Sequence, residues 1–578
     1  MQIPAEKQAP CIDWKSYMNN YNVNPGPRTP VSGLKAAATT DSAIVTETML
    51  KVLKSGGNAA DAGIAGALVQ AAVEPFMTNH AGLITFLYFD AKTGQIHQLD
   101  SLGGFPSGLP PFKPVPASAG SYAAVPPSAI IPGFMPGLEE IHRRFATRRW
   151  RELCADAVDW AERGHVVSSF EYRLMIETEK FITHFPEGRE FYQPKGMFAN
   201  VGEVFIPKGL AATLRGVAEQ GPDYMITGPW AEQFIAKANE MGWKIRLEHM
   251  TETPPRWIEP IRYRHHEYEI VSLGPPQAQG LIIAVALGVL KHLGIHEMKP
   301  LSADHLWAMG HALRQAARHW EYAQDENVYG VPRDEVVDDG YHAHLARMIR
   351  IARPKIDLSE HIRLSGEPSV GGDVMPLSGS GSKPRLGNSH SDQPTGSCEL
   401  AVVDAEGNWV QMMDTLQGSG IPGMVVGGVP MVGSHSTFGG LMSSMDATLV
   451  KGAKGRCIIG NTLVLKNNKP VLSAGSPGNV HCTVPQVLTY ALDFGLDPYS
   501  AVDAPRMLPM SEMRLITVED RISPAVLADL HKLGVRVSVT SGYDYHMGSF
   551  SVIARDEQTG QYTAIADPRR CAVADGIR

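Results

Sequence analysis

The sequence lacks the features that mark several classes of protein. Its 578 residues contain no block of basic side chains, and the formal net charge is −8, so we do not expect nucleic acid as a main partner. The longest apolar run, residues 281–290, is too short to span a bilayer, and we expect no membrane association. The first residues have no apolar core followed by a small-residue cleavage site, which argues against a signal peptide.

Cysteine is scarce, and its six positions have no pairwise metal-binding spacing. They are Cys11, Cys154, Cys398, Cys457, Cys482 and Cys571. We expect reduced thiols, a cytoplasmic location, and neither a metal nor a cofactor. The adjacent histidines His265 and His266 suggest a metal site, but neighbours on a strand point to opposite faces, so a surface edge is the expected role.

The composition is that of a globular protein, with 43% hydrophobic and 19% charged residues. Helices are predicted at residues 43–55, 62–73, 131–164, 279–294, 303–325 and 483–494. Paired strands are predicted at residues 86–90 with 96–99 and 461–465 with 470–474, and residues 418–440 read as a loop. Strands and helices on each side of a central strand pair predict a layered α/β fold.

That central pair follows residues 363–396, a stretch rich in Gly, Ser and Pro that predicts a flexible tail. Residues 400–403 and 409–413 then form an apolar hairpin around a turn at residues 404–408. If Val403 faces Trp409, Ser397 lies opposite Thr415, with Cβ atoms about 4.5–5.5 Å apart. Two hydroxyl groups are therefore expected to meet where the tail enters the sheet.

A serine that follows glycine at such a place can attack its own preceding carbonyl group. This N-to-O acyl shift cuts the chain between Gly396 and Ser397, and the freed α-amine then acts as general base for the Ser397 hydroxyl. The alternative is an ordinary serine at the edge of a strand. Spacing alone favours that alternative.

Six motifs, in this order and spacing, resemble the γ-glutamyltranspeptidases, which are N-terminal-nucleophile hydrolases. They are GGNAADAGIAGALVQAAVEP (56–75), FDAKTGQIHQLD (89–100), AVVDAEGN (401–408), AGSPGN (474–479), AVDAPR (501–506) and ADPRR (566–570). The resemblance implies a four-layer αββα sandwich made as one chain and cut into two subunits. It implies an N-terminal extension at residues 1–32, a large subunit at 33–396 and a small subunit at 397–578; a homodimer of this pair is left open.

The resemblance also implies roles for individual residues. The nucleophilic Thr of the family falls on Ser397, and a second active-site Thr falls on Thr415, which the hairpin count had reached independently. The Gly pair of the oxyanion hole falls on Gly478 and Asn479, where backbone donors survive a change of side chain. A family Asn falls on Gln417. Rival nucleophiles, one or two residues out of register, are Cys398 and Thr395.

This sequence differs from the family in the residues that bind the glutamyl head group of the substrate. The Arg that binds its α-carboxylate is replaced by Leu102, and a Ser pair with the same role falls on Cys457 and Ile458. The two Asp residues that hold the α-amine fall on Ser436 and Thr437. We therefore expect an amidohydrolase or acyltransferase for a non-γ-glutamyl amide. The alternatives are a γ-glutamyltransferase or glutathione hydrolase with a rearranged pocket, and an uncleaved, inactive scaffold or binding protein.

Overall fold

The computed structural model describes residues 26–104, 114–117, 121–124, 131–240, 244–277, 279–322, 324–361, 397–415, 423–431, 454, 460–509 and 515–578. Two seven-stranded antiparallel sheets dominate it. Sheet A has the order β1 (Val31–Leu34), β22 (Tyr562–Ala566), β21 (Ser551–Arg555), β17 (Lys469–Gly475), β16 (Asn461–Lys466), β11 (Tyr268–Ser272), β10 (Ile261–His265). Sheet B has the order β23 (Val573–Ile577), β2 (Ala36–Thr40), β12 (Cys398–Val403), β13 (Trp409–Thr415), β3 (Leu83–Asp90), β4 (Gln95–Ser101), β9 (Arg256–Ile258).

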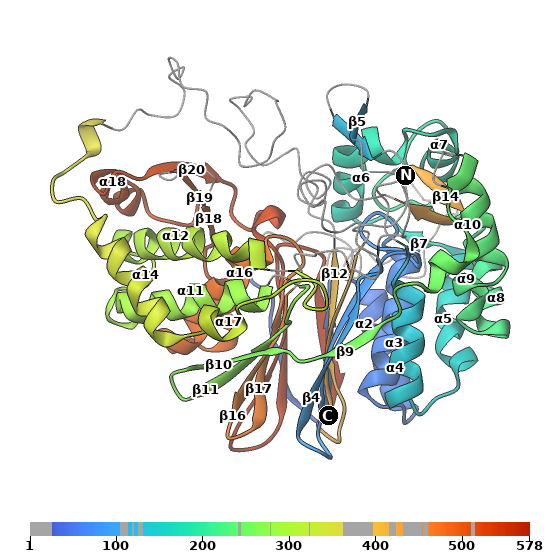
Figure 1. Cartoon of the computed structure of the whole chain (residues 1–578), viewed down its shortest axis with the longest axis horizontal. Coiled ribbons are helices and arrows are strands. Elements are labelled where there is room, and N and C mark those ends of the chain that lie inside the picture. The colour runs from blue at the N-terminus through green and yellow to red at the C-terminus, as the bar shows by residue number, and fades with distance from the viewer. Residues whose placement is uncertain are drawn as a thin grey trace.

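Helices cover the outer face of each sheet, which gives the predicted four-layer αββα sandwich (Figure 1). The outer face of sheet B packs against α2 (Ala43–Lys54), α3 (Ala59–Val73), α4 (Phe134–Phe145) and, through α3, α5 (Trp150–Arg163). Sheet A is covered by α11 (Gln279–Leu293) and α16 (Val480–Leu488), and α12 (Ala303–Ala317) and α14 (Asp339–Ile351) pack against α11.

The remaining elements extend the two helical layers or form small two- and three-stranded sheets (Figure 1). The helices are α6 (Ser169–Ile182), α7 (Pro186–Tyr192), α8 (Leu210–Gln220), α9 (Asp223–Ile226), α10 (Pro229–Glu240), α13 (Arg333–Val336), α17 (Pro498–Asp503) and α18 (Pro524–Lys532). The strands are β5 (Pro114–Ala117), β6 (Ser121–Ala124), β7 (His165–Val166), β8 (Val204–Phe205), β14 (Met424–Val426), β15 (Val429–Met431), β18 (Met507–Pro509), β19 (Leu515–Glu519) and β20 (Arg536–Thr540).

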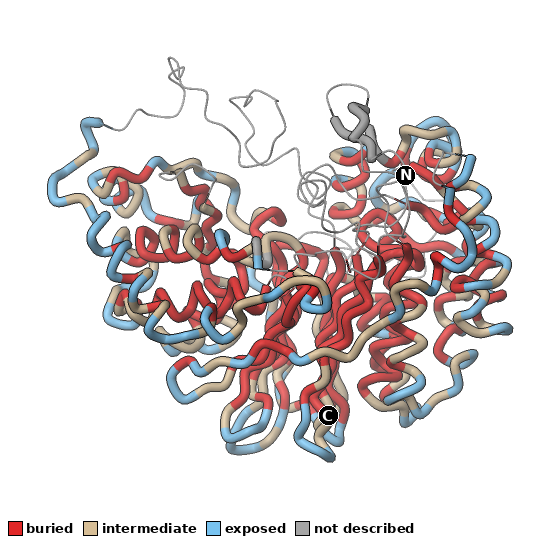
Figure 2. Tube along the Cα trace, viewed as in Figure 1, coloured by how far each residue is buried: buried red, intermediate tan, exposed pale blue. Residues whose placement is uncertain are grey.

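The central hairpin divides its side chains between two cores by strict alternation. Leu400 and Met412 point toward the helices on sheet B, whereas Ala401 and Met413 point into the space between the sheets. Figure 2 shows both sheets buried along most of their length. The helix that packs beneath the hairpin, α3, is buried at every residue, and its Ala and Gly side chains allow this close approach.

Several boundaries differ from the sequence predictions because local context changed the backbone. The segment predicted as one helix at residues 131–164 is α4 and α5, and the helix predicted at residues 303–325 ends at Ala317 and continues as a short 3₁₀ segment. Residues 424–431, predicted as loop, form the β14–β15 hairpin. The helix predicted from residue 483 begins at Val480 and becomes a π-helical segment, η7 (Thr489–Asp493).

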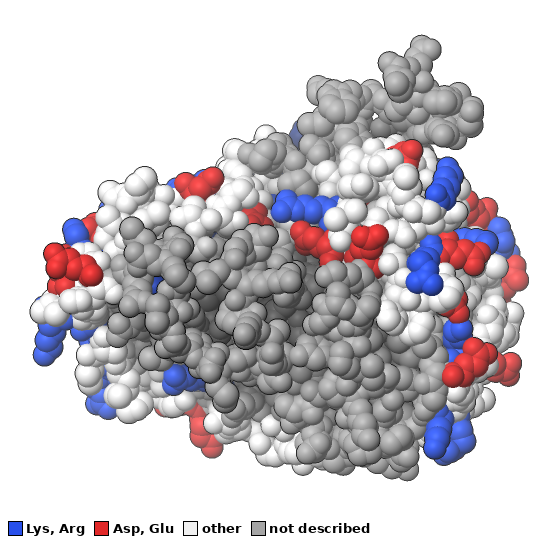
Figure 3. Space-filling view, turned by 90° about the horizontal axis from the view of Figure 1, so that it is seen from above, with Lys and Arg blue, Asp and Glu red and all other residues white. Residues whose placement is uncertain are grey.

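Within the described residues, no helix has both the length and the apolar character needed to cross a membrane. Seen from above, acidic and basic side chains alternate over the described part of the surface (Figure 3). Mixed charge of this kind is typical of an ordinary solvated surface.

Candidate active site

Ser397 and Thr415 meet at the end of the central hairpin. The observed register pairs Val403 with Trp409 and Cys398 with Asp414, as the turn predicted. Ser397 lies one step further, immediately before β12, and its Oγ donates a hydrogen bond to Thr415 Oγ1 at 3.0 Å. Both side chains are buried. The two hydroxyl groups therefore form a pair that is shielded from bulk water.

A buried arginine fixes the backbone of Ser397. Arg570 Nη1 donates to the Ser397 carbonyl oxygen at 2.9 Å and to Asp41 Oδ2 at 3.1 Å. Asp41 follows β2, the strand beside β12, and also accepts from Ser549 Oγ at 2.8 Å. Arg570 and Asp41 are both fully buried, so each charge compensates the other. The ion pair holds Ser397 at the junction of three chain segments.

The same guanidinium group connects Ser397 to the turn before α16. Arg570 Nη2 donates to the Pro477 carbonyl oxygen at 3.4 Å, which places this turn beside the serine. Gly478 and Asn479 have φ values of 74° and 45°, both in the left-handed region. Within the described part of the chain, neither backbone N–H donates to a backbone carbonyl group. The Asn479 side chain donates to the His546 carbonyl oxygen, so it is committed elsewhere. These backbone donors at a helix N-terminus suit an oxyanion.

A second polar network lies behind Ser397, between the two sheets. Glu399 Oε1 accepts from Gln411 Nε2 and, at 3.0 Å, from Asn461 Nδ2, and Thr85 Oγ1 donates to Asn461 Oδ1 at 2.6 Å. Glu399 is fully buried, and burial raises the pKa of its carboxyl group well above the ordinary 4.5. A buried carboxyl group thus joins sheet B to sheet A. Gly475 permits this, since a Cβ there would overlap Glu399 Oε1.

Cys398 lies on the opposite face of β12 from the Ser397 hydroxyl. Its thiol packs in a separate apolar cluster with Phe76 and Met77. Burial, with the neighbouring carboxyl groups of Glu74 and Asp414, raises the pKa of the thiol well above 9. The thiol is therefore protonated at neutral pH, and it is turned away from Thr415.

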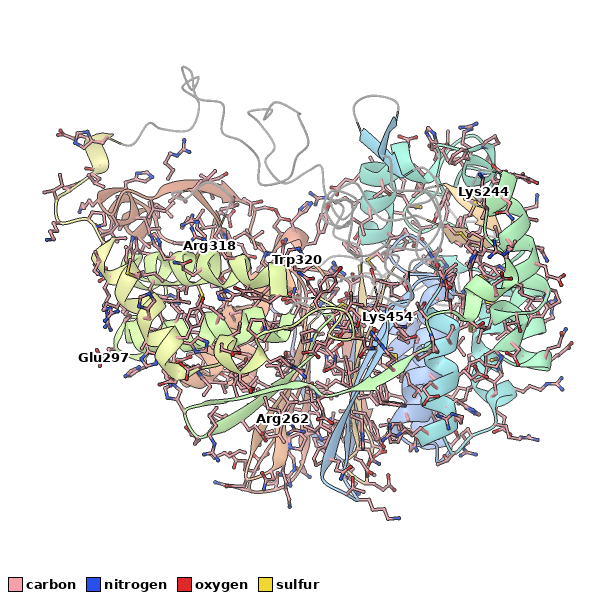
Figure 4. The ribbon with its side chains drawn as sticks, in the orientation of Figure 1. Lys244, Arg262, Glu297, Arg318, Trp320 and Lys454 are labelled. Carbon is pink, nitrogen blue, oxygen red and sulfur yellow. The ribbon has the colours of Figure 1, made fainter. Side chains whose placement is uncertain are left out.

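Leu102 is fully buried, and cations lie close to it in space. Its backbone N–H donates to Asp100 Oδ1 at 3.2 Å, and Asp100 pairs with Arg256 at 3.1 Å. Arg256 also pairs with Asp325 at 3.0 Å. Lys454, labelled in Figure 4, donates from Nζ to the carbonyl oxygens of residues 253 and 254, and burial lowers its pKa to about 8. Both cations are bound by groups of the chain itself.

Several predicted site residues lie outside the described residues. They are Gly396, Thr395, Gln417, Ser436, Thr437, Cys457 and Ile458. The predicted boundary between the two subunits falls immediately after Gly396.

The adjacent histidines do not behave as predicted. His265 ends β10, but His266 lies in the following turn with φ of 54°, so the alternation rule for strands does not apply to it. Both side chains reach Asp493, at 3.0 and 2.9 Å. The prediction of opposite faces is wrong.

Sequence reasoning missed three residues that shape the site. The local sequence gives Asp41 no role at the site, and it gives Arg570 only a place in the ADPRR motif. Glu399 stands beside the apolar run of residues 400–403, and all residues of β12 are buried. A carboxyl group inside a core needs polar partners, so its place in this strand was a signal that the sequence offered.

Comparison with known proteins agrees with the geometry. The family model described as gamma-glutamyltranspeptidase matches residues 45–577. The glutathione hydrolase proenzyme of Bacillus subtilis strain 168 is 24% identical over 549 residues, which cover 92% of this chain and 90% of that protein. The acylase ACY 1 proenzyme of Pseudomonas sp. strain SE83 is 22% identical over 562 residues, covering 95% of each.

Among solved structures, the cephalosporin acylase from Bacillus halodurans matches with a TM-score of 0.78 and 22% identity, over 96% of this chain and 98% of that one. This likeness establishes the same fold. Because the family model spans nearly the whole chain, the protein belongs to the γ-glutamyltranspeptidase family of N-terminal-nucleophile hydrolases, enzymes that act on amide bonds.

Proposed function

We propose that this chain cuts itself between Gly396 and Ser397 and then acts as an amidohydrolase or acyltransferase through an acyl-enzyme on Ser397. The observation that carries the proposal is the buried hydrogen bond from Ser397 Oγ to Thr415 Oγ1. A hydroxyl pair at the start of a central strand, with Arg570 bound to the Ser397 carbonyl oxygen, suits a nucleophile that becomes a new N-terminus.

Maturation begins with attack of Ser397 Oγ on the Gly396 carbonyl carbon. The new C–O bond forms as the C–N bond to Ser397 breaks, and the Oγ proton is transferred to the departing nitrogen. Water then hydrolyses the ester, which leaves a Gly396 carboxylate and a free Ser397 α-amine. Thr415 orients the attacking hydroxyl, and Arg570 restrains the Ser397 carbonyl group.

In the mature enzyme the α-amine, with an ordinary pKa of about 8, accepts the proton from Ser397 Oγ during attack on the substrate amide. The backbone N–H groups of Gly478 and Asn479 stabilise the oxyanion that develops on the substrate carbonyl oxygen. The protonated amine then returns its proton to the leaving nitrogen. Water or an acceptor amine takes the acyl group from Ser397 Oγ.

The geometry favours Ser397 over Cys398 as nucleophile. The Cys398 thiol is buried among apolar side chains, and its pKa is raised, so it offers almost no thiolate. The Cys398 side chain also points to the opposite face of sheet B from the Thr415 side chain.

We further propose that the acyl group of the substrate is neutral near the scissile bond. Leu102 supplies no charge, and the nearby cations Arg256 and Lys454 are held by carboxylate and carbonyl groups of the chain. Each charge-assisted hydrogen bond that a γ-glutamyl head group loses costs about 1.5–3 kcal/mol. Two such losses weaken binding by a factor of roughly a hundred or more.

The second candidate function is hydrolysis of glutathione itself. Relatives named as glutathione hydrolase proenzymes favour it, since they match over most of their length. Unaligned residues, such as those of the predicted loop at residues 418–440, would then have to supply the missing charges.

Intact-mass spectrometry tests the self-cleavage. We expect two fragments that end at Gly396 and begin at Ser397, and a single uncut chain for Ser397→Ala. Cys398→Ala is the matched control and should still be cut. A cut at any other bond, or active protein with an uncut chain, would contradict the mechanism.

The substrate class requires a separate assay on the cleaved enzyme. Glutathione and γ-glutamyl anilides are compared with a panel of neutral acyl anilides, and kcat/KM is measured for each. We expect higher values for neutral acyl groups. Efficient turnover of γ-glutamyl compounds alone, by protein that is cut as expected, would reject the proposed substrate class and leave the nucleophile assignment standing.

A further inference from the structure

The turn between β10 and β11 brings two imidazoles to one carboxylate far from Ser397. His265 Nε2 lies 3.0 Å from Asp493 Oδ2, and His266 Nε2 lies 2.9 Å from Asp493 Oδ1. The ligand atoms of the three side chains all lie within 4.8 Å of one another. The left-handed backbone at His266 produces this convergence, because it turns the second imidazole back to the side of the first.

Burial makes a negative charge on Asp493 unfavourable unless a positive charge compensates it. The side chains of Asp493 and His265 are 0% and 1% exposed, whereas that of His266 is 29% exposed. Among the described residues, the ion pairs of Asp493 are with these two imidazoles, and neither Lys nor Arg joins them. A buried carboxylate requires a compensating positive charge, from imidazole protons or from a bound cation.

The surroundings of the turn supply little other charge. Lys466 pairs with Glu557 at 3.1 Å and with Glu267, the residue after His266, at 4.0 Å. The ring of His296 lies 6.1 Å from that of His266. Figure 4 labels Arg262 on β10 and Glu297 in the short segment η3 (Ile295–Glu297), the two elements beside this turn.

We propose that His265, His266 and Asp493 bind a divalent transition cation of the Zn²⁺ type. Two imidazole nitrogens and one carboxylate oxygen are ligands that Zn²⁺ prefers, at distances of about 2.0–2.2 Å. Ligand atoms of a tetrahedral site at such distances lie roughly 3.3 Å apart, close to the N–O separations seen here. The exposed side of His266 leaves the fourth position to water.

Binding requires each imidazole to present Nε2 as a neutral acceptor. Where Nε2 carries the proton that faces Asp493, that proton moves to Nδ1, or leaves to solvent if the imidazole was charged. The cation takes over the compensation of the buried carboxylate. No bond is made or broken within the chain.

The site would brace the fold and take no part in the chemistry. Asp493 ends η7, which continues directly from α16, and α16 begins after the Gly478–Asn479 turn. The cation would therefore tie the outer edge of sheet A to the helical segment that starts beside Ser397. A brace of this kind predicts metal-dependent stability without a direct effect on cleavage.

Isothermal titration of untagged, full-length protein with Zn²⁺, and separately with Mg²⁺, tests the site. We expect one Zn²⁺ to bind with micromolar affinity and to raise Tm, and we expect no response to Mg²⁺, which prefers all-oxygen ligands. His266→Ala should weaken Zn²⁺ binding at least tenfold and abolish the Tm shift. The matched control His344→Ala, an exposed histidine on α14, should change neither.

His266 lies in a partly exposed turn, so its variant should fold, and far-UV circular dichroism checks this. Asp493→Asn provides the second variant and should also lose binding. The proposal is overturned if wild-type protein binds no Zn²⁺, if His266→Ala binds it unchanged, or if Mg²⁺ binds as well as Zn²⁺.

Discussion

Replacement of Glu399 tests whether a neutral carboxyl group joins the two sheets behind Ser397. In Glu399→Leu, the donors Gln411 Nε2 and Asn461 Nδ2 lose their shared acceptor inside the core. Gln411 Nε2 keeps only the Ser551 carbonyl oxygen at 3.5 Å, and Asn461 Nδ2 is left without its acceptor. A buried donor without a partner costs about 1–3 kcal/mol, so the free energy of unfolding should fall by at least about 1–3 kcal/mol. Glu399→Gln keeps an acceptor oxygen in place and should cost much less.

The pH dependence of the free energy of unfolding further distinguishes Glu399→Gln from wild type. Burial raises the pKa of Glu399 well above 4.5, so folding takes up a proton whenever the unfolded carboxyl group is ionised. The stabilising contribution is complete below about pH 4.5 and is lost as pH rises toward the folded pKa, by about 1.4 kcal/mol per pH unit. Glu399→Gln lacks this loss. Between pH 4.5 and 7 its stability should therefore rise relative to wild type.

Urea denaturation of uncut chains provides the measurement. All variants are made in the Ser397→Ala background, so that no cleavage occurs, and are compared at pH 4.5 and pH 7. Glu406→Gln, at an exposed position in the turn of the same hairpin, is the matched control and should stay near wild type. If Glu399→Gln is destabilised at pH 7 as strongly as Glu399→Leu, Glu399 is ionised in the folded protein and the reasoning fails.

Three further predictions concern neighbouring positions. Thr415→Ala should slow self-cleavage by about 10²–10⁴-fold without loss of the fold, and Thr415→Ser should restore it; a wild-type rate of the Ala variant, followed on denaturing gels, would exclude the orienting role. Gly475→Ala forces a Cβ into the Glu399 carboxyl group and should lower the urea midpoint by the equivalent of about 1–3 kcal/mol or more, whereas an unchanged midpoint would mean that Glu399 lies elsewhere. Burial raises the pKa of Glu74 to about 8, so wild-type stability should fall as pH rises from about 4.5 to about 8; Glu74→Gln should flatten this slope, and an unchanged slope would contradict the assignment.

Much of the scaffold around the site could be predicted from local signals. The Asn58–Asp61 capping box and the turn at residues 404–408 are both encoded by neighbouring residues. The hairpin reverses where the turn predicts, and the capping box starts α3 at Ala59, three residues before the predicted helix. The helix boundary at α16 could not be predicted in the same way. Asn479 adopts a left-handed conformation there, and the helix contains Pro485, which breaks the local rule.

The pairing of Ser397 with Thr415 was determined by the sequence itself, because hairpin register follows from a turn and a count of residues. The family was determined by it as well, because the order of the motifs survives in the sequence. Only the tertiary structure decided that Arg570, 173 residues beyond Ser397, and Asp41 converge on the serine. Hydrophobic patterning tells which face of an element is buried, but the partner of a buried charge depends on how distant strands and turns pack together. For the same reason, only the fold could bring Asp493 to histidines more than two hundred residues away.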